Sequence, residues 1–233
     1  MADTAYFLVA DLLGFGRIVN NSSEQELDQR ILAWTKLVDT TATAHGLGRL
    51  QLISDTLFVA ANDTEHELLS LIAFSRELLS KGIAASFPVR GAIVRGSYVW
   101  GKLTYGRAVV AAHSLEQAQN WVGITCDFAI PEASLLWALD RLICYPAPMK
   151  RARMQLYPAV SWEIPETEKL MRLMTSGGLS KANEVLTWEL GEKANNTILF
   201  RLYQDFLRHR GAPCSKFYGT LPVHPIEARL AGA

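Results

Sequence analysis

The stretch that decides the fold is Tyr6-Phe-Leu-Val-Ala-Asp-Leu-Leu-Gly-Phe-Gly16. Five uncharged and mostly apolar residues lead into Asp11, and a Gly-Phe-Gly sequence follows almost at once. A short apolar run that ends at a turn is typical of a strand buried on both faces. A carboxylate at the end of such a strand is costly to bury unless it is paired. It either caps the following turn or binds a hard cation, and a second carboxylate is needed to decide.

The composition limits the possible partners. The chain has 233 residues with 23 basic and 23 acidic side chains, so no overall charge favours a nucleic acid polymer or a membrane surface. Its three cysteines, Cys126, Cys144 and Cys214, are too few and too scattered for a disulfide framework or a zinc site. The sequence shows no basic leader and no long apolar segment. We expect a soluble, cytoplasmic protein that binds neither nucleic acid nor membranes.

Periodicity and turn signals predict an α+β fold, an α/β sandwich with mixed strands. The expected elements are a strand over 6–10, a helix over 23–44, a hairpin over 49–60, a helix over 64–81, two strands over 87–96 and 97–101, a helix over 108–119 and a strand near 124. Extended segments interrupted by proline follow over 141–146 and 154–162, then helices over 165–174 and 180–209 and an irregular tail over 211–233. We therefore divide the chain into a first domain, 1–128, and a C-terminal extension, 129–233, packed on it.

Asp55 is the second carboxylate, because it follows Ser54 at the tip of the expected hairpin. A compact sheet would place this hairpin beside the first strand, so Asp11 and Asp55 would meet at one edge. Two carboxylates there would hold one or two divalent ions, which activate an attacking oxygen and clamp a leaving phosphate. Gly14 and Phe15 in the nearby turn would expose backbone amides that suit phosphate oxygens.

Four blocks of sequence resemble the motifs of the class III nucleotidyl cyclases. In chain order they are Val9-Ala-Asp-Leu-Leu-Gly-Phe15, Ile53-Ser-Asp-Thr-Leu-Phe58, Val89-Arg-Gly-Ala-Ile-Val-Arg-Gly96 and Tyr105-Gly-Arg-Ala-Val-Val-Ala-Ala-His-Ser-Leu-Glu116. They lie within residues 6–127, about half of the chain. The resemblance implies a ferredoxin-like palm in a homodimer with composite sites between two protomers. It also implies attack of a ribose 3′-hydroxyl on the α-phosphate of a nucleoside triphosphate, with loss of pyrophosphate.

The resemblance assigns two divalent ions, Mn²⁺ or Mg²⁺, to Asp11, Asp55 and the backbone carbonyl of Leu12. The family uses a helical Asn and Arg to bind ribose and to stabilise the pentavalent phosphate, and Val110 and Ser114 stand at those positions here. The residue that reads a purine in the family, Lys or Glu, is Gln51 in this chain. An amide both donates and accepts hydrogen bonds, so Gln51 is able to read a base edge without charge.

Negative charge that develops during the reaction still requires cations. Arg95 and Arg107, in the motif turns, and Lys102 are the candidate substitutes for the missing arginine, with an ordinary solvated charge as the alternative for each. The predicted catalytic residues are therefore Asp11, Asp55, Arg95 and Arg107, and the predicted substrate-binding residues are Gly14, Phe15, Gln51 and Lys102.

The altered positions also resemble the bacterial pyrimidine cyclases of the Pycsar anti-phage systems, which are short cyclase domains with an extra C-terminal segment. This resemblance implies conversion of UTP to cyclic UMP, with CTP and ATP as alternative substrates, and a separate effector protein that reads the product and kills the cell. A degenerate domain that senses a nucleotide would also show Val110 and Ser114, although it has little need of two metal-binding carboxylates. A diguanylate cyclase or a polymerase is disfavoured, because no Gly-Gly-Asp-Glu-Phe run and no broad basic surface is present.

Overall fold

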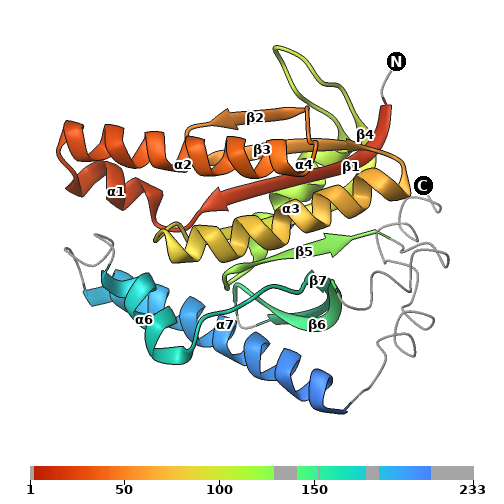
Figure 1. Ribbon diagram of the computed structural model, residues 1–233. Coiled ribbons are helices and arrows are strands. Elements are labelled where there is room, and N and C mark those ends of the chain that lie inside the picture. Colours follow the sequence, from red (N-terminus) through yellow and green to blue (C-terminus); the bar gives the residue numbers. More distant parts are fainter. Residues whose placement is uncertain (1–2, 129–140, 152, 177–183, 211–233) are drawn as a thin grey trace.

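The computed structural model describes residues 3–128, 141–151, 153–176 and 184–210. A seven-stranded sheet runs through the molecule in the order β2-β3-β1-β4-β5-β7-β6 (Figure 1). Only the β4–β5 pairing is parallel among the paired strands of the described chain. The strands are β1 (Asp3–Leu12), β2 (Leu50–Ile53), β3 (Thr56–Asn62), β4 (Val89–Tyr98), β5 (Gly123–Asp127), β6 (Leu142–Met149) and β7 (Arg153–Val160). This mixed sheet confirms the predicted α+β class.

Helices cover both faces of the sheet. Gly82 of α3 lies against Val89, whereas Ala108 of α4 lies against Gly96. Residues 89 and 96 of β4 are separated by an odd number of positions, so α3 and α4 pack on opposite faces. The helices are α1 (Phe15–Asn21), α2 (Glu24–Ala44), α3 (Glu65–Ala84), α4 (Arg107–Ala118), α6 (Thr167–Ser176) and α7 (Glu184–Arg210). Among the described helices, none combines the length and the apolar character needed to cross a bilayer.

β1 lies at the centre of the core, as its sequence predicts. Every side chain from Ala5 to Ala10 is at most 4% exposed. β1 pairs with β3 on one side and with β4 on the other, so both its edges and both its faces are covered. The run of apolar residues is therefore explained by burial on both faces, and Asp11 marks the point where the strand leaves the core.

The predicted starts of two helices agree with the structure, because a side chain caps the backbone at each start. The Ser23 hydroxyl accepts a hydrogen bond from the Glu26 amide at 3.3 Å, and the Glu26 carboxylate accepts one from the Ser23 amide at 2.9 Å. This reciprocal capping starts α2 at Glu24, one residue from the predicted start. At the start of α3, the Thr64 hydroxyl accepts a hydrogen bond from the Glu67 amide at 3.3 Å, without the reciprocal bond.

Two local predictions are wrong. Residues 87–101 do not form two strands joined at glycines, because β4 runs without a break from Val89 to Tyr98. Gly96 instead allows close packing, since a Cβ atom there would lie 3.4 Å from the Cβ of Ala108 in α4. Phe15 is the first residue of the short helix α1 and not part of an open turn. The predicted break at 177–178 and the tail 211–233 lie outside the described residues.

We expect Gly106→Ala to lower the free energy of unfolding by about 2 kcal/mol or more in urea denaturation. Gly106 has φ +140°, and a Cβ atom there would lie 2.6 Å from both the carbonyl oxygen of Ser97 and the Cα of Tyr98. Gly191→Ala in α7 is the matched control, because its added Cβ meets nothing within 4 Å. That control should change stability by no more than about 1 kcal/mol, in the stabilising direction. Equal stabilities for the two variants would contradict this account of Gly106.

Candidate active site

The sheet brings Asp11 and Asp55 together. Asp11 stands near the end of β1, and Asp55 lies in the tight turn between β2 and β3. β1 and β3 pair through Ala10 and Leu57, so the turn that carries Asp55 lies beside the end of β1. Ser54 has φ 58° in this turn, and the Thr56 hydroxyl donates to Asp11 Oδ1 at 3.3 Å. The expected adjacency of the first strand and the hairpin is therefore confirmed.

Asp11 is partly buried and lies close to the carboxylates of Asp55 and Glu116. Its side chain is 26% exposed, and its pKa is raised to about 7, first by burial, then by Asp55 and then by Glu116. The nearby Arg90 opposes this rise but does not cancel it. Two partly buried carboxylates with too little positive charge around them are a donor set that suits a divalent cation. On this ground the residues present fit the expected metal ions.

The protein side chains would not complete the coordination sphere. Within the described residues, no group of three or more His, Cys, Asp or Glu side chains could hold a metal ion. The nearby Glu116 is already bound to Arg90. A metal ion would therefore depend on Asp11, Asp55, backbone oxygen such as that of Leu12, and oxygen atoms from substrate or water.

We expect Asp11→Asn to stabilise the metal-free protein at pH 8. The pKa of Asp11 is about 7 in the folded protein and about 4 in an unfolded chain, so the folded state holds the extra proton between these values. Ionisation of Asp11 therefore costs stability as the pH rises from about 4 to about 7, and asparagine avoids this cost. In chelator at pH 8 the melting temperature of the variant should lie a few degrees above that of the wild type. Each kcal/mol of added stability raises it by about 2–4 °C. If the gain in melting temperature at pH 8 is no larger than the gain at about pH 4.5, the raised pKa of Asp11 is contradicted.

A buried polar network supports Asp11 from the neighbouring strand, and none of its members was predicted as a site residue. Arg90 lies directly opposite Asp11 in the β1–β4 pairing, with its Nη2 atom 4.0 Å from Asp11 Oδ2. Its Nε atom donates to Glu116 at 2.6 Å, and Nη1 donates to the carbonyl oxygen of Gln119 at 3.1 Å. The Gln119 side chain donates to the Gly91 carbonyl and accepts from Trp121.

The sequence motifs contain Arg90 and Glu116 but do not predict that the two side chains meet. Arg90 and Glu116 belong to the third and fourth blocks of the cyclase resemblance, but 26 positions separate them. They meet because α4 packs across β4. The network fixes the end of α4 against the strand that faces Asp11.

The structure separates Arg95 from the carboxylate pair within one chain. Arg95 lies opposite Tyr6 in the β1–β4 pairing, whereas Arg90 lies opposite Asp11. Arg95 also donates to Asp63 through Nε at 2.7 Å and through Nη2 at 2.5 Å. This partner raises the pKa of Arg95 and lowers that of Asp63. Arg95 thus belongs to a surface ion pair at the far end of the strands, and its catalytic role stays a prediction.

The remaining predicted residues lie on separate elements of the fold. Lys102 is exposed in the segment between β4 and α4, and Arg107 is the exposed first residue of α4. Gln51 of β2 is half-buried, and its Oε1 atom accepts a hydrogen bond from the Thr104 hydroxyl at 3.1 Å. Gly14, with φ 84°, caps the start of α1.

The two altered family positions are both exposed on α4. Val110 is 68% exposed, and Ser114 is also exposed one turn further along the helix. Neither residue packs into the core of its own chain, so both are available to a ligand or to a second chain. Arg107, seven positions before Ser114, is the only lysine or arginine of α4.

No family model matches the chain, and no curated protein matches it. Solved structures do match it. The catalytic core of a rhodopsin-guanylyl cyclase with converted specificity, in complex with ATPαS, is 14% identical with a TM-score of 0.55 and covers 69% of this chain and 96% of its own. The chain has the class III nucleotidyl cyclase fold.

Two further structures agree. A monomeric double mutant of the guanylyl cyclase domain of the RhoGC fusion protein from the aquatic fungus Blastocladiella emersonii is 15% identical with a TM-score of 0.54. The match covers 70% of this chain and 97% of the fungal domain. A bacterial light-regulated adenylyl cyclase is 14% identical with a TM-score of 0.50, and the match covers 74% and 97% of the two chains. At these identities the likeness concerns the fold alone.

Proposed function

We propose that this protein is a nucleotidyl cyclase that converts a nucleoside triphosphate, UTP by preference, into a 3′,5′-cyclic nucleotide and pyrophosphate. The observation that carries the proposal is the Asp11–Asp55 pair, which lies at the strand ends of a cyclase-type sheet, with the pKa of Asp11 raised to about 7. In the reaction, the ribose 3′-oxygen bonds to the α-phosphorus. The bond from that phosphorus to the oxygen bridging to the β-phosphorus breaks, pyrophosphate leaves with the bonding electrons, and the hydroxyl proton passes to water.

Asp11, Asp55 and the Leu12 carbonyl would hold Mn²⁺ or Mg²⁺ in this site. When bound, these ions supply positive charge to the attacking oxygen and to the phosphate oxygens. The chain itself contributes the position of the two carboxylates. Arg90 restrains Asp11 from the opposite strand, and the β2–β3 turn sets the position of Asp55.

Gln51 and Thr104 support a neutral base reader. Because the Thr104 hydroxyl donates to Gln51 Oε1, the Gln51 amide nitrogen remains able to donate and the Thr104 oxygen remains able to accept. An adjacent donor and acceptor complement the O4 and N3–H groups of uracil. The half-buried rings of Phe58 and Trp100 contact the fully buried Phe7 on the same face of the sheet, and these two rings would pack against a base.

A homodimer is part of the proposal. Large apolar side chains are exposed around this face at the end of β2, on the segment after β4 and on α4: Ile53, Leu103, Tyr105 and Val110. Their exposed fractions run from 54% to 72%, which is typical of a surface that a second protein covers. Guanylyl cyclase domains of the fungal RhoGC protein have been solved in dimeric and in monomeric form.

The wider role follows the resemblance to pyrimidine cyclases. The cyclic nucleotide would act as a second messenger for a separate effector protein in anti-phage defence. Residues 129–233 would form the C-terminal extension, and its described strands β6 and β7 join the sheet through β5. A nucleotide-binding sensor is the second candidate function, which the exposed Val110 and Ser114 favour because neither carries the positive charge of an arginine.

A competition experiment tests the proposed base preference. The full chain is incubated with Mn²⁺ and an equimolar mixture of ATP, GTP, CTP and UTP, and the products are identified by mass. Cyclic UMP as the main product supports the proposal. Cyclic CMP, AMP or GMP as the main product contradicts the choice of UTP. Tight nucleotide binding without any cyclic product favours the sensor.

A further inference from the structure

The short segment that follows α4 connects the proposed metal site with the C-terminal part of the chain. Gln119 caps the end of α4, and its backbone carbonyl accepts a hydrogen bond from Arg90 Nη1 at 3.1 Å. Asn120, Trp121 and Val122 then lead into β5. None of these residues was predicted as a site residue. Whatever holds this segment in place therefore also holds one acceptor of the Arg90 guanidinium.

α7 holds the segment through two hydrogen bonds. The Asn196 side-chain amide donates to the Asn120 carbonyl at 2.7 Å, and the Thr197 hydroxyl accepts from the Val122 amide at 2.9 Å. The same hydroxyl donates to a carbonyl of its own helix at 2.7 Å, and Thr197 is fully buried. The hydroxyl thus has both its donor and an acceptor site in use. The two anchors on α7 lie on either side of Trp121 in the segment.

The indole of Trp121 carries this constraint back to Gln119. Its ring is fully buried and packs edge-on against Phe200 of α7, with the ring centroids 4.8 Å apart, and against Tyr145 of β6 at 5.5 Å. Its Nε1 atom donates to Gln119 Oε1 at 2.8 Å. The Gln119 Nε2 atom donates in turn to the Gly91 carbonyl of β4 at 2.7 Å. The Gln119 side chain is therefore fixed between β4 and the rings that α7 and β6 pack together.

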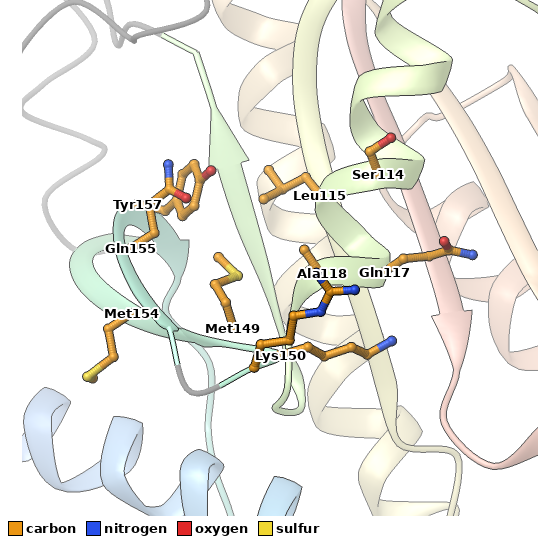
Figure 2. A pocket seen from close by; sticks show the side chains of 10 residues that line it. Ser114, Leu115, Gln117, Ala118, Met149, Lys150, Met154, Gln155 and Tyr157 are labelled. Carbon is orange, nitrogen blue, oxygen red and sulfur yellow. The ribbon is translucent and has the colours of Figure 1, made fainter.

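The β6–β7 hairpin fastens the same segment from its other end. Figure 2 shows Ala118, the last residue of α4, beside Met149 and Lys150 of the hairpin. The Lys150 amide donates to the Ala118 carbonyl at 2.7 Å, and the Asn120 amide donates to the Pro148 carbonyl at 2.9 Å. These bonds join backbone groups and remain when side chains on α7 are replaced. The contribution of α7 can therefore be tested separately.

The contacts of the segment bear on where the Arg90 guanidinium lies. Its Nε and Nη2 atoms bind Glu116, and Nη1 binds the Gln119 carbonyl. Nη2 is 4.0 Å from Asp11 Oδ2, which is beyond hydrogen-bonding distance. If the Gln119 carbonyl moved away, Nη1 would lose its acceptor, and Arg90 would be free to turn to Asp11. A direct ion pair there would compete with a divalent cation for the same carboxylate oxygens.

We propose that Asn196 and Thr197 of α7 are positioning residues for the metal site. By holding the segment 119–122, they keep Arg90 away from Asp11 and leave that carboxylate free for a divalent cation. The inference rests on the proposed function, because it takes the pair of aspartates to be a metal site. It gives α7 a part in forming a site that lies at the ends of β1 and β2.

The first test measures metal binding without nucleotide. Mn²⁺ is titrated into the full chain, and the electron paramagnetic resonance signal of the free ion gives the bound fraction. We expect Asn196→Ala/Thr197→Val to bind Mn²⁺ about tenfold more weakly than the wild type, since loss of the groups that support a metal ligand typically has an effect of this size. Thr197→Ser keeps the hydroxyl and should bind Mn²⁺ like the wild type.

A control separates positioning from a general loss of stability. Ile72 of α3 is fully buried on the face of the sheet opposite α4, and Ile72→Val lowers the melting temperature by removing one buried methylene group. This variant should bind Mn²⁺ like the wild type. Equal Mn²⁺ affinities for Ile72→Val and Asn196→Ala/Thr197→Val would overturn the proposal. If the double variant does not fold, Trp121→Phe replaces it, because phenylalanine keeps an aromatic ring but lacks the Nε1 donor.

The second test asks whether the effect passes through Arg90. Arg90→Met/Glu116→Met removes the buried ion pair, so adding Asn196→Ala/Thr197→Val to it should change the Mn²⁺ affinity by less than about twofold. A further tenfold loss in this background would overturn the proposal. Absence of Mn²⁺ binding by the wild type, or binding that survives Asp55→Asn, would overturn it together with the metal site. If the expected Mn²⁺ affinities are found but no cyclic nucleotide forms, the proposed function fails while the role of α7 stands.

Discussion

Asp55→Asn is expected to lower the rate of cyclic nucleotide formation about 1,000-fold or more at saturating Mn²⁺. Asparagine keeps the shape of the side chain but removes the negative charge that a divalent cation requires. The β2–β3 turn does not depend on that charge, so the melting temperature should stay within a few degrees of the wild type. Initial rates of pyrophosphate release, together with the mass of the nucleotide product, measure this effect.

A control variant distinguishes the loss of a carboxylate at the site from the loss of a carboxylate elsewhere on the surface. Asp39→Asn removes one carboxylate from an exposed position on α2 and should leave the rate unchanged. Raising the Mn²⁺ concentration should not rescue Asp55→Asn if both carboxylates are required. Survival of more than about a tenth of the wild-type rate in Asp55→Asn would mean that this carboxylate does not hold a catalytic ion.

Glu116→Ala is expected to produce the largest loss of stability. Glu116 is 1% exposed and Arg90 is 6% exposed, and they form an ion pair through Arg90 Nε and Nη2. Removing the carboxylate leaves the guanidinium buried with only a carbonyl partner and a distant Asp11. Such a loss typically costs about 3–5 kcal/mol, and urea denaturation would measure it as a lower midpoint at an unchanged slope.

A surface ion pair provides the contrast for Glu116. Asp63→Ala breaks the Arg95–Asp63 pair, whose side chains are 47% and 31% exposed, and should cost at most about 1 kcal/mol because water replaces the lost contact. Replacing both buried partners, in Arg90→Met/Glu116→Met, should recover part of the stability lost in Glu116→Ala. If Glu116→Ala costs no more than Asp63→Ala, the buried network does not hold α4 on the sheet.

The sequence predicted the elements whose signals are local. The apolar run over Tyr6–Ala10 predicted β1, since a short apolar run that ends at a turn is typical of a strand buried on both faces. Ser23 and Glu26 predicted the start of α2, because their side chains bond the first amides of that helix. The pairing of β1 with β3 confirmed the expected adjacency of Asp11 and Asp55. Their metal-binding and catalytic roles stay predictions.

The features that the sequence did not predict depend on contacts between distant segments. Gly96 suggested a turn, but the packing of Ala108 in α4 against β4 explains the glycine. Pro146 suggested an interrupted segment, yet it lies within β6, which is the edge strand of the sheet and tolerates a missing amide donor. The Arg90–Glu116–Gln119 network joins segments 26 positions apart, and the packing of α4 on β4 creates it.

The most direct test of the central claim is the mass of the product that the purified full chain forms from UTP and Mn²⁺. The account predicts a nucleotide lighter than UMP by one water molecule, which identifies the cyclic monophosphate, released with one equivalent of pyrophosphate. Formation of UDP with inorganic phosphate, or of UMP, would show attack by water and contradict cyclisation. If ATP, GTP and CTP also give no cyclic product, the Asp11–Asp55 site is not that of a cyclase.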